Sequence, residues 1–126
     1  MPSKPQLTQA AGQKALDWLQ GQMGLEHWRI TLLITDDMPA WAVTGPDDGC
    51  GRLAYEETYL RAKVWLSPAM CLTEGRDALH TLFHEVVHLF LVNADVNNDS
   101  DKIEFMVDRI ADAWAFAYRH GMKPWR

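Results

Sequence analysis

The feature that most restricts the fold of this chain is an apolar segment, residues 76 to 92, that contains two histidines and a glutamate. Apolar side chains fall on almost every side of a helix drawn through it, which predicts a core helix of about four to five turns. Burying His84, Glu85 and His88 together is unfavourable unless these side chains find partners. A bound metal ion would provide one such partner.

The spacing of these three residues suits a metal site, because it matches the pattern H-E-x-x-H. Positions 84 and 88 differ by about 40° around a helix and by one turn of rise, so both imidazoles can converge on one ion. Zinc accepts imidazole ligands, and a catalytic zinc site keeps one position for water. Glu85 lies roughly 60° around the helix from His88, within reach of that water, and is predicted to act as the general base.

A second helix, expected over residues 102 to 119, offers the third ligand that such a zinc site requires. Its acids Glu104, Asp108 and Asp112 are spaced four residues apart and form one stripe beside small alanines. We predict Glu104 as the ligand and Asp108 as the acceptor of a hydrogen bond from a metal-bound histidine. Two alternatives remain: Asp108 as the ligand, or an exposed acidic face without a metal.

The remaining residues predict an α+β fold. An amphipathic pattern indicates a helix over residues 7 to 23, and a β-branched run indicates a strand over residues 28 to 35. Residues 52 to 56 and 60 to 66 predict two strands joined as a hairpin, followed by an irregular stretch that ends at Gly75. A length of 126 residues with 48% apolar side chains fits a single domain, residues 1 to 126.

Charge and patterning limit the expected partners and compartment. A formal net charge of -5 is poorly suited to a phosphate backbone, so we expect no nucleic-acid partner. No segment has the roughly 20 apolar residues that span a membrane, and the polar first residues do not form a signal peptide. Cys50 and Cys71 are expected to be reduced thiols in a cytoplasmic protein, with a disulfide or a regulatory thiol as alternatives. No pattern indicates an oligomeric state.

The two predicted helices together resemble a known group of enzymes. Residues 84–88 and 104–108 resemble the H-E-x-x-H and E-x-x-x-D motifs of gluzincin metallopeptidases, the thermolysin-like clan. The resemblance implies zinc ligands at His84, His88 and Glu104, with Glu85 as general base and Asp108 in support. It also implies a minimal zincin-like fold: an N-terminal helix, a small antiparallel sheet of about three strands, and two packed helices that carry the metal. Residues 60 to 66 would be the edge strand that pairs with an extended peptide.

The chain departs from the large members of this group in two respects. The interval between His88 and Glu104 is short, and the chain ends soon after the last helix, where large members carry a second subdomain that stabilises the oxyanion. The residue that contacts the oxyanion or the substrate is therefore expected elsewhere. The candidates, each with an ordinary surface role as its alternative, are Tyr118, His120, Arg109, Tyr59 and His80.

Three functions are consistent with these features. The leading expectation is a small cytoplasmic zinc peptidase that cleaves a peptide or protein substrate. The second is a binding or regulatory protein that keeps the zincin fold and the metal but does not cleave. The third is an interaction module without metal, in which the histidines are structural. Metal content distinguishes the third function from the first two, and turnover distinguishes the first from the second.

Overall fold

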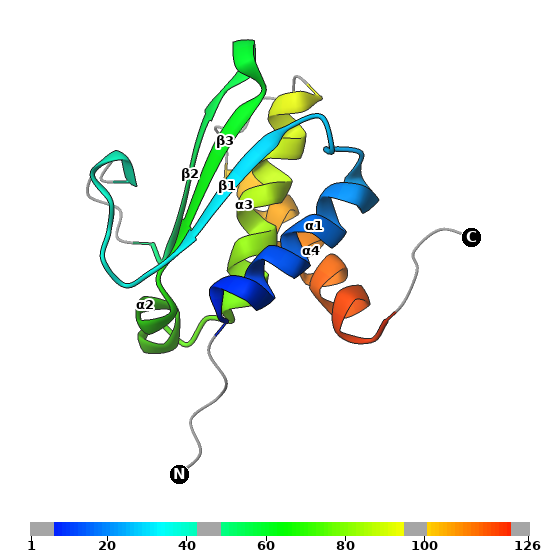
Figure 1. The fold of residues 1–126 in the computed structure, drawn as a ribbon. Helices are drawn as coiled ribbons and strands as arrows, with labels where there is room; N and C mark the ends of the chain where they lie inside the picture. Colours follow the sequence, from blue (N-terminus) through cyan, green and yellow to red (C-terminus); the bar gives the residue numbers. More distant parts are fainter. Residues whose placement is uncertain (1–6, 43–48, 95–100, 122–126) are drawn as a thin grey trace.

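The computed structural model of the chain describes residues 7–42, 49–94 and 101–121. Three strands form one sheet, α1 and α3 pack on one face of it, and α4 packs against α3 (Figure 1). This arrangement confirms the predicted α+β layout. None of the described helices combines the length and apolarity needed to cross a bilayer. In chain order the elements are α1 (Gln9–Met23), β1 (Arg29–Ile34), η1 (Ala40–Ala42), β2 (Gly51–Glu56), η2 (Glu57–Tyr59), β3 (Arg61–Leu66), α2 (Pro68–Thr73), α3 (Ala78–Asn93) and α4 (Asp101–Arg119).

The sheet is mixed, with strand order β1-β3-β2. The predicted hairpin is present, because β2 and β3 pair antiparallel from Gly51↔Leu66 to Glu56↔Arg61. The pairing of β1 differs from the expected antiparallel sheet, since β1 and β3 run parallel. The cause is that β3 inserts between β1 and β2 and makes β1 an outer strand. Ile34 at the end of β1 and Gly51 at the start of β2 both pair with Leu66 at the end of β3. Because β1 and β3 end at the same place, they run parallel.

The strand order also corrects the expected edge strand. Residues 60 to 66 were expected at the edge, but β3 is central and β2 occupies an edge. In β3, Val64 and Leu66 are fully buried on the core face, and Trp65 is fully buried on the opposite face. Its indole Nε1 donates a hydrogen bond to the carbonyl oxygen of Thr35 at 3.0 Å. Burial on both faces is typical of a central strand.

A short helix, α2, occupies the stretch that was expected to be irregular. The hydroxyl of Ser67 accepts a hydrogen bond from the backbone N–H of Met70 at 3.1 Å, and Pro68 takes the first helical position. Serine followed by proline is a helix-start signal as well as a strand-end signal. The next helix, α3, begins after Asp77, whose carboxylate accepts a hydrogen bond from the N–H of Leu79 at 3.2 Å.

The core explains why α3 and α4 pack closely. One group of buried side chains lies between the sheet, α1 and α3, and it includes Leu19, Val64 and Phe83. A second group joins α3 to α4 through Val87, Leu91 and Val107. Ala111 and Ala115 of α4 are also buried, and their small side chains let the α4 backbone approach α3. The acids on the neighbouring positions of α4 are thereby brought to the histidine-bearing side of α3.

The first residue of β2, Gly51, lies against α3. A Cβ atom at this position would lie 2.8 Å from Cγ2 of Thr81 and 3.0 Å from Cδ2 of Leu66. Because overpacking costs about 1–3 kcal/mol, we expect Gly51→Ala to lower the free energy of unfolding by that amount. The matched control is Gly21→Ala in α1, where a Cβ atom would have no atom of residues 7–42, 49–94 or 101–121 within 4 Å. It is expected to stabilise by about 0.5–1 kcal/mol. Urea unfolding measures both, and equal effects would contradict the close approach.

Candidate metal centre

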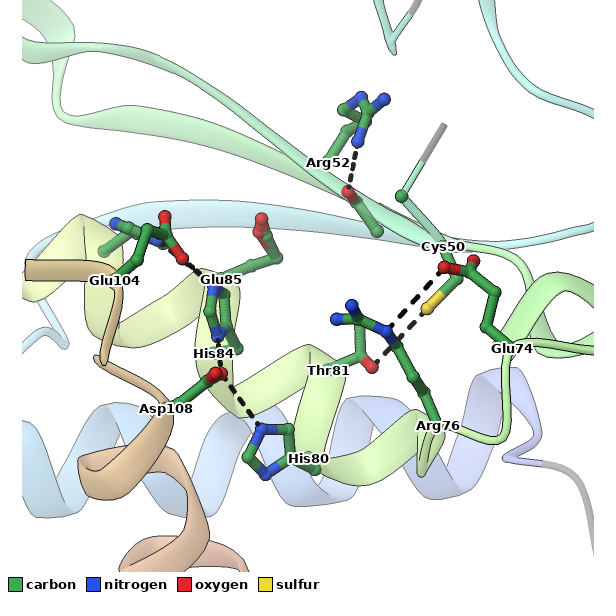
Figure 2. A pocket seen from close by; sticks show the side chains of 13 residues that line it. Cys50, Arg52, Glu74, Arg76, His80, Thr81, His84, Glu85, Glu104 and Asp108 are labelled. Carbon is green, nitrogen blue, oxygen red and sulfur yellow. Dashed lines mark hydrogen bonds and ion pairs between the residues drawn. The ribbon is translucent and has the colours of Figure 1, made fainter. Parts of the chain in front are cut away.

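The three residues predicted as metal ligands meet at one point between α3 and α4. The Nε2 atoms of His84 and His88 lie 3.2 Å apart. The carboxylate of Glu104 places Oε2 3.2 Å from Nε2 of His84 and Oε1 2.8 Å from Nε2 of His88. Figure 2 shows Glu104 reaching from α4 toward the His84 ring on α3. Two imidazoles and one carboxylate therefore direct their ligand atoms at a common position.

These distances fit a zinc ion. Zinc binds imidazole nitrogen at about 2.0–2.1 Å, so two ligand atoms on a tetrahedral ion lie about 3.3–3.4 Å apart. Two of the three separations here, both 3.2 Å, agree with that value, and the third, 2.8 Å, needs Glu104 to move by a few tenths of an ångström. The donor set of two histidines and one glutamate is one that catalytic zinc sites use.

Asp108 orients His84 from the opposite side of the imidazole. Its Oδ1 lies 2.7 Å from Nδ1 of His84. An ionised carboxylate only accepts hydrogen bonds, so Nδ1 donates and Nε2 keeps its lone pair for the ligand position. Burial opposes ionisation of Asp108, but hydrogen bonds and charge from His84 and His80 outweigh it and lower the pKa of this carboxyl. Because Asp108 contacts Nδ1 whereas His88 approaches Nε2, the geometry favours Glu104 over Asp108 as the third ligand.

A second set of possible ligand atoms, from His80, His84 and Asp108, lies next to the first. If both sites held an ion, His84 would bind one through Nε2 and the other through Nδ1, which requires an imidazole with no proton on either nitrogen. The contacts instead describe a hydrogen-bonded chain. His80 places Nδ1 2.7 Å from Oδ1 of Asp112 and Nε2 3.4 Å from Oδ1 of Asp108. We therefore interpret His80 as a support for Asp108 and not as a ligand.

Glu85 has the surroundings expected of a proton-transfer group. Its Oε2 atom is buried and has no hydrogen-bond partner among the described residues. Burial raises the pKa of this carboxyl, while the charges of His84 and His88 act in the opposite direction. In Figure 2 the carboxylate of Glu85 points from α3 toward β2. A buried carboxylate with a raised pKa is a stronger base than an exposed one, which suits it to accept a proton.

The ligands, Glu85 and Asp108 line one cavity of about 580 Å³. The start of β2 forms one wall, and the segment before α3 forms another. These walls carry residues that the sequence interpretation did not identify, because nothing in their local pattern connects them with the histidines. They are Gly49, Cys50, Gly51, Arg52, Glu74, Arg76 and Thr81.

The five candidates for oxyanion or substrate contact lie in different places. His80 lines the cavity itself. His120 lines an adjoining hollow of about 600 Å³, which also contains His80. Tyr118 is partly buried and packs against the core, with its ring 5.1 Å from that of Trp18. The other two lie on the surface, where the guanidinium of Arg109 is over the ring of Phe105 and Tyr59 is exposed in the turn between β2 and β3.

Both cysteines are free thiols, which excludes the disulfide alternative for this structure. Cys50 and Cys71 are buried, and their Sγ atoms lie 3.6 Å and 3.8 Å from Oγ1 of Thr81. A hydrogen bond from Cys71 lowers the pKa of Cys50 to about 6, against the effect of burial. The same interaction and burial raise the pKa of Cys71.

A scan against protein families and searches of curated proteins and solved structures found no match to this chain. The geometry of the cavity and the spacing of the residues that line it therefore provide the indications of function.

Proposed function

We propose that this protein is a zinc-dependent hydrolase that cleaves amide bonds in a peptide or protein. The supporting observation is that His84, His88 and Glu104 converge on one point with the buried carboxylate of Glu85 on the same cavity. Catalytic zinc sites have three protein ligands and one position for water or substrate, whereas structural sites are closed by four. Among the described residues, the group around this point has three members.

The proposed reaction is addition of water to an amide carbonyl followed by cleavage of the C–N bond. Zinc at this position would polarise the carbonyl and lower the pKa of the attacking water to about 7. Glu85 accepts the proton that the water loses and delivers it to the leaving nitrogen. Asp108 holds His84 in the tautomer that presents Nε2. The products are a carboxylate and an amine.

A peptide substrate is favoured by the position of β2. One side of β2 pairs with β3, and the other side is an edge of the sheet. Gly51 and Arg52 at the start of β2 line the cavity that holds the ligand residues. An extended peptide can add to such an edge through backbone hydrogen bonds, which would lay its carbonyl groups along the cavity. The role first expected for residues 60 to 66 is thereby assigned to β2. In this proposal the protein is gluzincin-like and acts in the cytoplasm, where thiols stay reduced.

The decisive experiment is a zinc-to-protein ratio on material never exposed to chelator, together with cleavage of a quenched fluorescent peptide library. We expect one zinc per chain for the unmodified protein, a ratio far below one for Glu104→Ala, and cleavage that depends on zinc. A zinc-to-protein ratio near zero, together with an unchanged melting temperature in His84→Ala, would refute both zinc-dependent functions. The protein would then be an interaction module without metal. One zinc per chain without cleavage would indicate a binding protein.

Removing the support behind His84 should weaken zinc binding without abolishing it. We expect Asp108→Ala to lower zinc affinity about 10–100-fold, because His84 loses the acceptor that sets its tautomer and ring orientation. Asp112→Ala is the matched control, since Asp112 lies one turn further along α4 and contacts His80 but not His84. Competition with a chromophoric chelator measures both affinities. Equal losses of zinc affinity in the two variants would show that the negative charge of α4 supports the metal, and not the hydrogen bond from His84 to Asp108.

A further inference from the structure

One arginine of the cavity has donors that nothing in the described structure uses. Arg76 lies between α2 and α3, and Figure 2 shows its guanidinium extending into the cavity beside Thr81 and Cys50. Its ion pair with Glu74 is long, 3.7 Å from Nε to Oε1, and 61% of the Arg76 side chain is exposed. Among the described residues, the two terminal nitrogens of Arg76 have no hydrogen-bond partner. They remain free to bind an anionic group.

A second arginine, Arg52 on β2, contributes to the cavity lining, but its guanidinium lies on the other side of the strand from Arg76 (Figure 2). Arg52 donates from Nη1 to the carbonyl oxygen of Gly51 at 3.2 Å. Its Nε atom is buried and has no hydrogen-bond partner in the described part of the chain. A buried donor without an acceptor is unfavourable, but the guanidinium of Arg52 does not converge with that of Arg76 on one anion.

Most acids of the cavity lie on the two metal-site helices, away from Arg76. α3 and α4 contribute Glu85, Glu104 and Asp108, whereas the segment before α3 contributes Arg76 together with Glu74, its partner in the long ion pair. A zinc ion would offset the acids of the helices. It would not pair with Arg76, which lies on another wall. Guanidinium groups bind carboxylates through two parallel hydrogen bonds, so a carboxylate is the anion that suits these donors.

We propose that Arg76 binds a carboxylate of the peptide substrate. This inference rests on the proposed peptidase function and adds a substrate preference to it. The guanidinium lies beside Thr81, which is three residues, or about 4.5 Å, before His84 along α3. An extended peptide advances about 3.3–3.4 Å per residue. The recognised carboxylate is therefore placed one or two residues from the cleaved bond, on an acidic side chain or at the C-terminus of the substrate.

The test is a binding measurement on the zinc-loaded, full-length Glu85→Gln protein, which keeps the ligands but lacks the base. The probes are fluorescein-labelled, alanine-rich heptapeptides with an amidated C-terminus, in which one position at a time is Glu or Gln. We expect the Glu peptide to bind about tenfold more tightly than its Gln counterpart at one or two adjacent positions. A further peptide set with a free C-terminal carboxylate identifies whether the side chain or the terminus is bound.

Variants connect the preference to Arg76. Adding Arg76→Gln should reduce the Glu-to-Gln ratio below about twofold, and Arg76→Lys should restore part of it because the charge returns without the planar donors. The control is Arg61→Gln, since Arg61 is an exposed arginine at the start of β3 that lies by Tyr59. This variant should leave the ratio unchanged.

Three results would overturn the inference: equal binding of Glu and Gln peptides at every position, no binding of any peptide, or a preference that survives Arg76→Gln. Cleavage of the Gln peptides by the unmodified enzyme is assayed separately. A preference that depends on Arg76 without any cleavage would refute the hydrolase proposal and retain the carboxylate site. Cleavage of the peptides without a preference for Glu over Gln would support the hydrolase proposal and refute the carboxylate site.

Discussion

Replacing Glu85 with glutamine should leave one zinc bound per chain and lower kcat for peptide cleavage by a factor of about 10²–10⁴. The amide has nearly the same shape as the carboxylate but cannot accept the proton that the attacking water loses. The protein should remain folded, because Oε2 of Glu85 is already buried with no hydrogen-bond partner in the described part of the chain, and a neutral amide costs less to bury than a charge. The loss should therefore fall on turnover and not on folding or metal content.

The measurement combines steady-state kinetics on one fluorogenic peptide with metal analysis of the same preparation. Glu57→Gln is the control, because Glu57 is an exposed glutamate in the turn between β2 and β3. It should keep both zinc and activity. Full activity in Glu85→Gln would show that another group transfers the proton, and loss of zinc in that variant would place Glu85 among the ligands.

Chelation of the metal should lower the melting temperature by more than about 10 °C. A ligand that binds only the folded state at 1,000 times its Kd stabilises that state by about 4 kcal/mol. For a domain of this size, each kcal/mol corresponds to about 3–5 °C. The ligands come from α3 and α4, whose contact depends on a small group of apolar side chains that includes Val87, Leu91 and Val107. A shared ion would add a second link between these two helices.

Thermal melts with and without a zinc-selective chelator test this prediction. In His88→Ala the difference between the two melts should nearly vanish, because one imidazole is missing from the ligand set. Re-addition of zinc should restore the melting temperature of the unmodified chain, and magnesium should not, since Mg²⁺ prefers oxygen ligands. If chelator leaves the melting temperature unchanged although zinc is removed, the ion does not hold α3 and α4 together.

The sequence alone determined the local parts of this protein. The i, i+4 spacing of His84 and His88 places both rings on one side of any helix that includes them, whatever the helix packs against. The hairpin of β2 and β3 and the helix that carries the acids also follow from short-range patterns of apolar and turn residues. Glu104 and Asp108 are also four residues apart, so the sequence predicts that both lie on one side of their helix. This allowed them to be predicted as the acids that face the histidines.

Only the tertiary structure decided how these parts meet. The insertion of β3 between β1 and β2 made β2 an edge strand, and no local pattern carries that strand order. The separation of α4 from α3, set by Ala111 and Ala115, brings Glu104 to Nε2 of His84 and Asp108 to Nδ1. Arg76 enters the cavity because the chain turns between α2 and α3. These features arise from contacts between residues far apart in the chain. The energies of such contacts depend on three-dimensional packing, which short-range sequence patterns do not predict.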